Sequence, residues 1–188
     1  MELKVIRLDA DRQADFYRVH NKEHGHGWCF CVAWWVLSWN GWEERTSDEN
    51  RLMREQLFDV GQYDGYLMYD GDTPIGWCQV GPRDQLHKLV IDYRLPVDHD
   101  AWAITCFFII PKYREIGLGY YMLTEILKDL EKQGVKYVQA FPRRGKKISP
   151  EDMWTGPEGY FIKAGFTLER DDPIYPVYGR HAPDFDIR

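Results

Sequence analysis

The sequence has few of the residues that mark secreted, zinc-binding or membrane proteins. Only four of its 188 residues are cysteine, and Cys29 and Cys31 lie too close together for a usual structural disulfide. No Cys-x-x-Cys pair supports a zinc site. No apolar run approaches the roughly 18 residues that a membrane-spanning helix needs, and the first ten residues do not resemble a signal peptide. We therefore expect reduced thiols, no metal, no membrane partner and a cytoplasmic protein.

Basic residues are also in deficit. The 24 Lys and Arg against 30 Asp and Glu leave a net charge of −6, which argues against nucleic acid as a partner. The deficit lies in residues 1–100, which carry −7, whereas residues 101–188 carry +1. An acidic front half favours a cationic partner, although surface acids usually only aid solubility. The length and the 44% apolar content suit one globular domain with a sizeable core.

The most informative stretch is ITCFFIIPKYREIGLG, which predicts a strand, a turn and the start of a helix. Ile104–Ile110 is a continuous apolar run typical of a strand covered on both faces, and Pro111 ends it because proline cannot donate to the ladder. Apolar residues then recur at helical spacing from Leu118 until Gly134, which suits the position just after a helix. Glycines at a helix N-terminus let backbone N–H groups approach an anion, and a neighbouring arginine adds a charge-assisted donor. The turn therefore predicts a pyrophosphate site, although two glycines also suit a plain tight turn.

This turn is neither a Walker loop, which needs Gly-Lys-Ser/Thr, nor a dinucleotide fingerprint, which needs a third glycine. Its Arg-x-x-Gly-x-Gly pattern (residues 114–119), placed shortly after Pro111, resembles the acyl-CoA loop of the GNAT superfamily of N-acetyltransferases. Two further motifs are similar to that family: the hairpin of residues 65–81 around an Asp-Gly turn, and a closing helix that ends in Lys-Ala-Gly-Phe before a strand. The resemblance covers about residues 64–178, whereas residues 1–60 match only in their coarse order.

The resemblance implies the α/β GNAT fold. We expect a central mixed, mostly antiparallel sheet of about six to seven strands flanked by helices. A V-shaped splay should separate two central parallel strands, Ile104–Ile110 and Val135–Phe141. We expect one acetyltransferase domain over residues 1–188, in which residues 64–178 form the CoA-binding core and residues 1–63 form the variable wall on the acceptor side.

The implied reaction is acetyl transfer from acetyl-CoA to a primary amine of a small molecule or peptide. The amine attacks the thioester directly, and no metal takes part. The backbone N–H groups of Phe108 and Ile109 are candidates for holding the thioester oxygen, and a homodimer is left open. The residues expected to contact the cofactor are Phe108, Ile109, Arg114, Glu115, Ile116, Gly117, Leu118, Gly119, Tyr120 and Phe161.

The catalytic groups of the family are harder to place in this sequence. Many members carry a tyrosine four residues before the glycine of the closing motif as general acid, but here that position is Phe161. The tyrosine is Tyr160, which lies about 100° away around a helix. We keep Tyr160 as the candidate acid, with water as the alternative. The central strand has no carboxylate, so Asp92, Asp98 or His99 would have to act as the base through a water.

The lack of a clear general acid and general base keeps two other functions open. A catalytically inactive acyl-CoA-binding sensor or interaction module needs the loop but no acid or base. A plain α/β domain needs no CoA site at all. Cys106 does not close the gap as a nucleophile, because nothing basic flanks this thiol in the sequence.

The front half is expected to hold the acceptor. Leu3–Leu8 predicts a strand, and Asp9 or Asp11 predicts the start of a helix that continues to about Lys22. Trp28–Trp42 contains five of the eight tryptophans and predicts a strand followed by an irregular segment. Its aromatic side chains form core or, as the alternative, a pocket that binds an amine by cation–π contact.

Several other stretches allow two interpretations. His24 and His26 suit a loop better than a metal site, because no carboxylate or thiol cluster completes the ligand set. The basic residues 143–147 form a solvated loop or, as the alternative, a contact for the CoA phosphates. The remaining expected elements are a helix from Thr46 or Ser47 to about Val60, a strand or loop at Leu86–Leu95, a linker or short helix at Ser149–Thr155, and strands at Thr167–Arg170 and Ile174–Tyr178.

Overall fold

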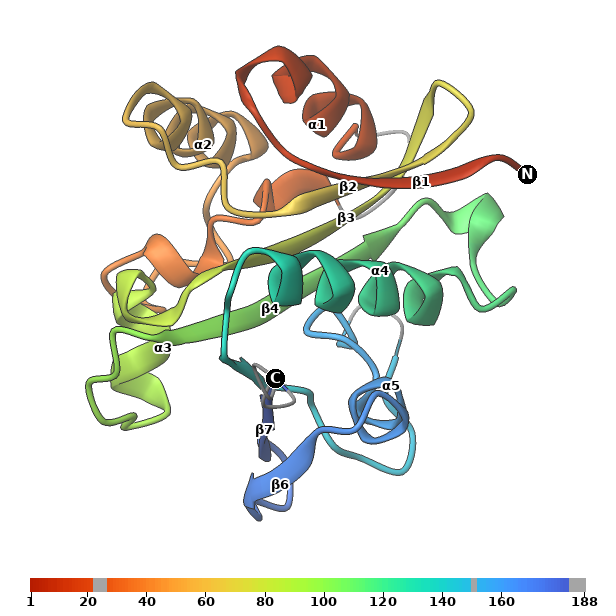
Figure 1. The fold of residues 1–188 in the computed structure, drawn as a ribbon. Helices are drawn as coiled ribbons and strands as arrows, with labels where there is room; N and C mark the ends of the chain where they lie inside the picture. Colours follow the sequence, from red (N-terminus) through yellow and green to blue (C-terminus); the bar gives the residue numbers. More distant parts are fainter. Residues whose placement is uncertain (22–26, 150–151, 183–188) are drawn as a thin grey trace.

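One mixed sheet organises the computed structural model, which describes residues 1–21, 27–149 and 152–182 (Figure 1). Within these ranges the sheet has seven strands in the order β1-β2-β3-β4-β5-β7-β6. Neighbouring strands run antiparallel, except that β4 and β5 are parallel. The predicted mixed, mostly antiparallel sheet is confirmed. The strands are β1 (Leu3–Arg7), β2 (Tyr66–Asp70), β3 (Thr73–Pro82), β4 (Ala101–Ile109), β5 (Tyr137–Ala140), β6 (Thr167–Arg170) and β7 (Val177–His181).

Helices cover both faces of this sheet (Figure 1). The α-helices are α1 (Gln13–Val19), α2 (Ser47–Asp59), α3 (His87–Asp92), α4 (Leu118–Lys132) and α5 (Glu158–Lys163). On one face, the ring of Phe16 in α1 packs edge-on against Trp77 of β3 and Phe58 of α2, with centroids 4.9 and 5.4 Å away. On the other face, Asp129 of α4 accepts a hydrogen bond of 2.8 Å from the hydroxyl of Tyr66 in β2. The sheet is therefore the middle of three layers.

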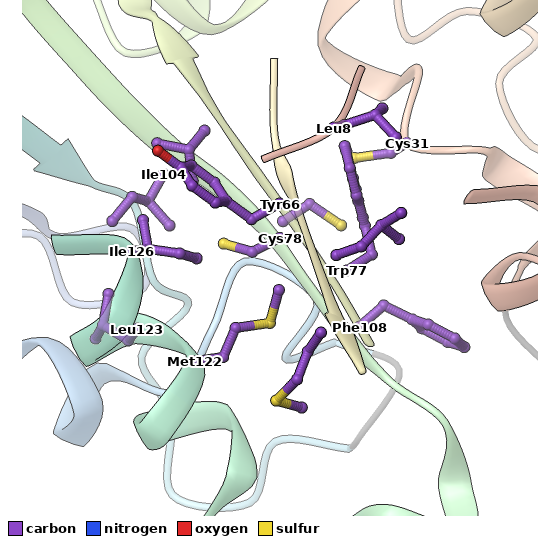
Figure 2. Packing of buried hydrophobic residues seen from close by; sticks show 14 of the residues in the cluster. Leu8, Cys31, Tyr66, Trp77, Cys78, Ile104, Phe108, Met122, Leu123 and Ile126 are labelled. Carbon is purple, nitrogen blue, oxygen red and sulfur yellow. The ribbon is translucent and has the colours of Figure 1, made fainter. Parts of the chain in front are cut away.

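Alternation along β3 sends neighbouring side chains to opposite faces of the sheet. Trp77 faces the α1 side, whereas Cys78 faces α4 and packs near Met122 and Ile126 (Figure 2). These four side chains are fully buried. Burying an apolar side chain of this size contributes about 1.5–3 kcal/mol to the free energy of unfolding. Packing against the sheet therefore stabilises α4 at the position that the helical spacing of its apolar residues predicted.

The central strand and its parallel neighbour separate halfway along their length. β4 pairs with β5 only from Ala101 to Ile104, because β5 ends at Ala140 while β4 continues to Ile109. Beyond the paired part, the N–H of Phe107 donates instead to the carbonyl of Trp154, at 2.7 Å. The predicted splay lies at this point and leaves the second half of β4 open on one edge.

Three expectations for the front half and the middle of the chain were wrong. Residues 28–42 contain no strand, because left-handed conformations at Phe30 and Cys31 (φ +42° and +53°) turn the chain between two 3-10 turns. Leu86–Leu95 is neither strand nor loop: α3 forms there because apolar side chains at helical spacing, including Leu89, are buried on one face. The first helix ends at Val19 rather than near Lys22.

Two smaller expectations also need correction. The side chain of Asp9 does not cap a helix, because it pairs with Arg12 instead. The last strand begins at Val177 rather than Ile174, because Asp172 accepts hydrogen bonds from the N–H groups of Ile174 (2.9 Å) and Tyr175 (2.8 Å) and holds that stretch as a turn.

Thr46, rather than Ser47, caps α2. Its hydroxyl accepts from the N–H of Glu49 at 3.2 Å, and the Glu49 carboxylate accepts from the N–H of Thr46 at 2.7 Å. Thr46→Ala is therefore expected to lower the free energy of unfolding by about 1 kcal/mol, because it leaves helix N–H groups without partners. Ser47→Ala is the matched control and is expected to cost much less. Equal losses for the two variants in urea unfolding would contradict this assignment.

Candidate active site

A cavity of about 770 Å³ lies where the splay, the glycine turn and the front half of the chain meet. Three groups of residues line it. The turn contributes Arg114, Glu115, Gly117, Leu118 and Gly119; the splay contributes Cys106, Phe107, Phe108, Ile109, Met153, Trp154, Pro157 and Tyr160; and the front half contributes His20, Trp28, Cys29, Cys31, Ala33, Trp34, Trp39 and Trp42. Pro111 and Tyr113 complete the lining.

The turn before α4 presents free backbone N–H groups at a helix N-terminus. Gly117 is the N-cap with a left-handed φ of +83°, and the first bond of the helix runs from the N–H of Tyr121 to the carbonyl of Gly117, at 3.1 Å. The N–H groups just before Tyr121 are therefore free of intrahelical partners. A Cβ built on Gly117 meets nothing within 4 Å, whereas one on Gly119 would lie 2.8 Å from Cε2 of Tyr160. The backbone is thus open toward the cavity at the first glycine and closely packed at the second.

Arg114 joins this turn to the central strand. Its Nε donates to the carbonyl of Ile109 at 2.7 Å, and its guanidinium carbon lies 5.6 Å from the ring centroid of Phe108. Its remaining N–H groups make no hydrogen bond to any described residue, and Arg114 is one of the residues that line the cavity. An arginine held this way offers a pre-oriented donor pair to a phosphate.

The open edge of β4 presents one of the two predicted amide groups. Backbone N–H groups alternate between the two edges of a strand. The N–H of Phe107 points to the splay, where it meets Trp154, and the N–H of Ile110 points to β3, where it meets the carbonyl of Ile75 at 3.0 Å. The N–H of Ile109 therefore faces the opening, and the N–H of Phe108 faces β3.

Tyr160 and Phe161 of α5 point in different directions, as the rotation of about 100° per helical residue predicted. Tyr160 lines the cavity beside Gly119. Phe161 is 0% exposed, packs between Phe107 and Phe166, and does not line the cavity. Among the other predicted contact residues, Ile116 is 60% exposed and Tyr120 packs under the Lys163 ammonium, and neither lines the cavity.

The profile of the acetyltransferase (GNAT) family matches residues 14–145 of the chain. The chain belongs to this family. It is a GNAT-type acetyltransferase, and it moves acetyl groups. A search of curated protein sequences finds no match.

Solved structures of acetyltransferases share the fold. The PaiA N-acetyltransferase of Thermoplasma acidophilum in complex with coenzyme A has a TM-score of 0.56 at 14% identity, over 97% of this chain and 100% of that one. A mosquito arylalkylamine N-acetyltransferase like 5b has a TM-score of 0.58 at 15% identity, over 96% of this chain and 100% of that one. A third structure is the N-acetylglutamate synthase of Neisseria gonorrhoeae, complexed with coenzyme A and N-acetyl-glutamate. It has a TM-score of 0.53 at 11% identity, over 96% of this chain and 35% of that one. At these identities the likeness establishes the fold of the acetyltransferase.

Tryptophans form one wall of the acetyltransferase cavity. Trp28 and Trp42 have ring centroids 5.2 Å apart, and the contacts continue from Trp42 to Trp39 (5.8 Å), from Trp39 to Trp34 (5.4 Å) and from Trp34 to Trp154 (5.5 Å). Trp34 is 6% exposed and also belongs to a buried cluster. These tryptophans therefore belong partly to the core and partly to the lining of the cavity.

A second cavity of about 560 Å³ shares three tryptophans with the first, namely Trp34, Trp39 and Trp154. Charged side chains of both signs line it: Asp92, Arg94, Arg143, Asp152, Arg170 and Asp172. These three tryptophans thus line both cavities of the acetyltransferase.

None of the three predicted base candidates lines the first cavity of the acetyltransferase. Asp92 accepts from the indole N–H of Trp39 at 2.5 Å and lines the second cavity. Asp98 accepts from the N–H of Asp100 at 3.1 Å, and His99 is exposed. Among the described residues, the only carboxylate that lines the first cavity is Glu115, on the turn.

His20 is a cavity residue that nothing in the sequence pattern indicated. It lies at the end of α1, is 3% exposed, and its Nδ1–H donates to the carbonyl of Phe16 at 2.9 Å. Burial lowers the pKa of His20 to about 3. The imidazole is therefore neutral at physiological pH and is a weak base.

The two arginines of the basic stretch after β5 form ion pairs within the acetyltransferase. Arg144 pairs with Glu158 at 2.5 Å and Asp171 at 2.6 Å, and Arg143 pairs with Asp152. These pairs oppose the alternative that the two arginines bind CoA phosphates.

The described residues hold no group of three or more His, Cys, Asp and Glu side chains suited to a metal ion. His24 and His26 lie outside the described residues. No helix in the described ranges is long and apolar enough to cross a membrane.

Proposed function

We propose that this acetyltransferase transfers an acetyl group from acetyl-CoA to a primary amine of a small molecule or peptide, by direct attack of the amine on the thioester. One observation carries the proposal: a single cavity joins the anion cradle of residues 114–119 to the tryptophan wall. Both substrates then share one space, as direct attack requires.

The cradle suits the pyrophosphate of acetyl-CoA. The N–H groups of Gly117, Leu118 and Gly119 supply the donors, the positive end of the α4 dipole adds attraction, and Arg114 adds a charge. The N–H of Ile109 is our candidate for holding the thioester oxygen, because it faces the open edge of β4. Tyr160 stays our candidate for the general acid, because it lines the cavity and has an acidic proton, unlike Phe161.

The lining of the cavity supports the expected assignment of different parts of the chain to the two substrates. We propose one domain over residues 1–188, with residues 64–178 as the core that binds acetyl-CoA and residues 1–63 as the acceptor wall. Four of the five tryptophans between Trp28 and Trp42 line the cavity. Trp154 is an exception, because it belongs to the core region and yet extends the aromatic wall.

The test is acetylation of a panel of amines, measured by mass spectrometry of the amine products. The panel contains arylalkylamines, amino acids, polyamines, aminoglycosides and short peptides. We expect acetylated product with amines whose carbon body suits an aromatic wall, and none with the same amines already N-acetylated. Acetyl-CoA that raises the melting temperature without acetylating any amine would instead support an inactive acyl-CoA sensor. No rise at many times any plausible Kd would contradict both.

A further inference from the structure

The end of α1 holds the imidazole of His20 in one tautomer. The carbonyl of Phe16 accepts two hydrogen bonds from this residue, one from its backbone N–H at 3.0 Å and one from Nδ1 at 2.9 Å. A carbonyl oxygen can only accept, so Nδ1 carries the ring proton and Nε2 of the neutral ring presents a lone pair. Nε2 itself makes no hydrogen bond to any described residue. His20 therefore has one strong acceptor atom that the fold leaves unused.

The unused atom lies on the edge of the ring that reaches the first cavity. The imidazole stacks between Phe16 and Phe108, with centroids 4.0 and 5.8 Å away, and meets Trp77 at 6.0 Å. Unlike the unpartnered indole nitrogen of Trp77, Nε2 is not sealed from solvent. Because rings cover both faces and Nδ1 is tied to the helix, the Nε2 edge is the part of His20 that lines the cavity.

Phe108 connects His20 to the rest of the site. It is paired with Trp77 across β3 and β4 and lies on the same side of the sheet (Figure 2). The ring of Phe108 also lies 5.6 Å from the guanidinium carbon of Arg114 on the turn. The residue after Phe108 is Ile109, whose N–H is our candidate for holding the thioester oxygen. His20 is thus one ring away from the strand position at which we propose acetyl transfer.

The wall that we assign to the acceptor offers an amine few other hydrogen-bond acceptors. From the described part of the front half, the cavity is lined by four tryptophans, two cysteines, one alanine and His20. An indole N–H only donates, and a thiol sulfur is a weak acceptor. An amine brings N–H groups that need acceptors when water is removed from them. Nε2 of His20 is the strongest side-chain acceptor that this wall presents.

The surroundings of His20 disfavour a charged amine. Aromatic rings pack around the imidazole, and the nearby charge that acts on it is the guanidinium of Arg54, which is 1% exposed. The one described carboxylate that lines the cavity, Glu115, lies on the turn. A buried ammonium without an opposite charge is costly. An amine beside His20 is therefore favoured in its neutral form, which is also the form that can attack a thioester.

We propose that Nε2 of His20 accepts a hydrogen bond from the acceptor amine and orients its nitrogen, in the neutral form, toward the thioester. The proposal rests on the function proposed above and names the side chain that positions the acceptor. His20 keeps its Nδ1 proton throughout and gains none, so its role differs from that of a general base. With one N–H directed at Nε2, the lone pair of the nitrogen is free to face the thioester carbon.

The proton balance of the reaction closes without a charged base. The acceptor leaves its ammonium proton in solvent before it binds. The neutral nitrogen forms the new C–N bond to the thioester carbon, and the C–S bond breaks with its electron pair on the CoA sulfur. Tyr160, our candidate acid, gives its proton to that sulfur and regains one from the nitrogen. The products are the amide and the free thiol of CoA.

His20→Phe tests the proposal, and His20→Gln is the matched variant that keeps an acceptor. Phenylalanine fills the space of the ring but has no lone pair, whereas the amide oxygen of glutamine lies close to the position of Nε2. We expect His20→Phe to lower kcat/KM for phenethylamine about tenfold, the size of one hydrogen bond, and His20→Gln to recover most of the loss. The Kd for acetyl-CoA, measured by calorimetry, is expected to stay unchanged in both.

Two results of this comparison would overturn the proposal. Wild-type kcat/KM in His20→Phe would show that the amine does not use Nε2. Equal losses in His20→Phe and His20→Gln would show that the imidazole acts through its packing and not through its lone pair.

The pH profile distinguishes a neutral amine from a titrating group of the enzyme. The thiols of Cys29, Cys31 and Cys106 line the same cavity as His20 and would add a step of their own if they titrated. We expect kcat/KM to rise with pH until the ammonium of the substrate is deprotonated. The rise should therefore occur at lower pH for the β,β-difluoro analogue of phenethylamine, whose ammonium is a stronger acid. A rise at the same pH for both amines would overturn the selection of the neutral amine.

Nitrogen-15 NMR of the imidazole gives a measurement that needs no turnover. We expect the native protein to show His20 as the neutral Nδ1–H tautomer, with its signals assigned by their loss in His20→Gln. Phenethylamine added at alkaline pH without acetyl-CoA is expected to shift the Nε2 resonance. An Nε2–H tautomer, an imidazolium, or a resonance that no amine of the panel shifts would overturn the proposal. A shifted Nε2 resonance with no acetylated amine would contradict the proposed function and support the amine contact of His20.

Discussion

Arg114→Ala is expected to weaken the binding of acetyl-CoA roughly 10- to 100-fold, because it removes charge-assisted hydrogen bonds worth about 1.5–3 kcal/mol. Arg114 lines the cavity, and among the described residues its hydrogen bonds are limited to the one from Nε to the carbonyl of Ile109. The variant therefore also frees the turn from β4. Calorimetric titration with acetyl-CoA measures the effect, and raising the salt concentration is expected to reduce the difference between wild type and variant.

Lys112→Ala is the control for Arg114→Ala. This lysine is two residues away and equally charged, but its ammonium lies over the ring of Tyr113, 4.9 Å from the centroid, and it does not line the cavity. We expect less than a threefold change in affinity for it, since long-range charge is screened. Equal losses for the two variants would mean that the turn attracts the cofactor by net charge alone, and would contradict the specific role of Arg114.

His20 is expected to make the fold sensitive to acid. Its pKa is about 3 in the folded protein and 6.5 as a free side chain, so between these values the unfolded chain binds a proton that the folded protein excludes. The stability from neutral His20 is then fully present above about pH 6.5 and is lost as the pH falls. The slope is about 1.4 kcal/mol per pH unit for one proton.

His20→Phe isolates this contribution. Phenylalanine keeps a ring of similar size between Phe16 and Phe108, where the imidazole stacks at 4.0 and 5.8 Å, and it cannot be protonated. We expect urea unfolding between pH 6.5 and 4 to show a clearly flatter decline for this variant than for wild type. His87→Asn, at an exposed histidine, is the control and is expected to follow wild type. Parallel declines for wild type and His20→Phe would show that carboxylates alone govern acid unfolding.

The parts of the fold that local sequence signals specify were predicted well. The α4 helix and its left-handed Gly134, the β2–β3 hairpin and the proline that ends β4 each depend on residues within one element. The rotation that separates Tyr160 from Phe161 also follows from helix geometry alone.

The predictions that were wrong depend on contacts between distant segments. Residues 28–42 have the composition of a strand, but Arg54, more than twenty positions later, holds the carbonyls of Phe30 and Cys31 and turns the chain there. No signal near Cys31 announces this partner. The N-cap of α2 was also left open by the sequence, because Thr and Ser are both favourable N-cap residues. The structure shows that Thr46 is the N-cap.

The sequence by itself determined the strand, the glycine turn and the helix between Ile104 and Lys132, because glycines, prolines and apolar periods act within a few residues of the chain. Only the tertiary structure decided which groups meet at the reaction space. His20 follows α1, Cys31 and four tryptophans come from the segment before α2, Phe108 comes from β4 and Tyr160 from α5. The charge state of a buried group depends on neighbours that the fold brings together from distant parts of the sequence.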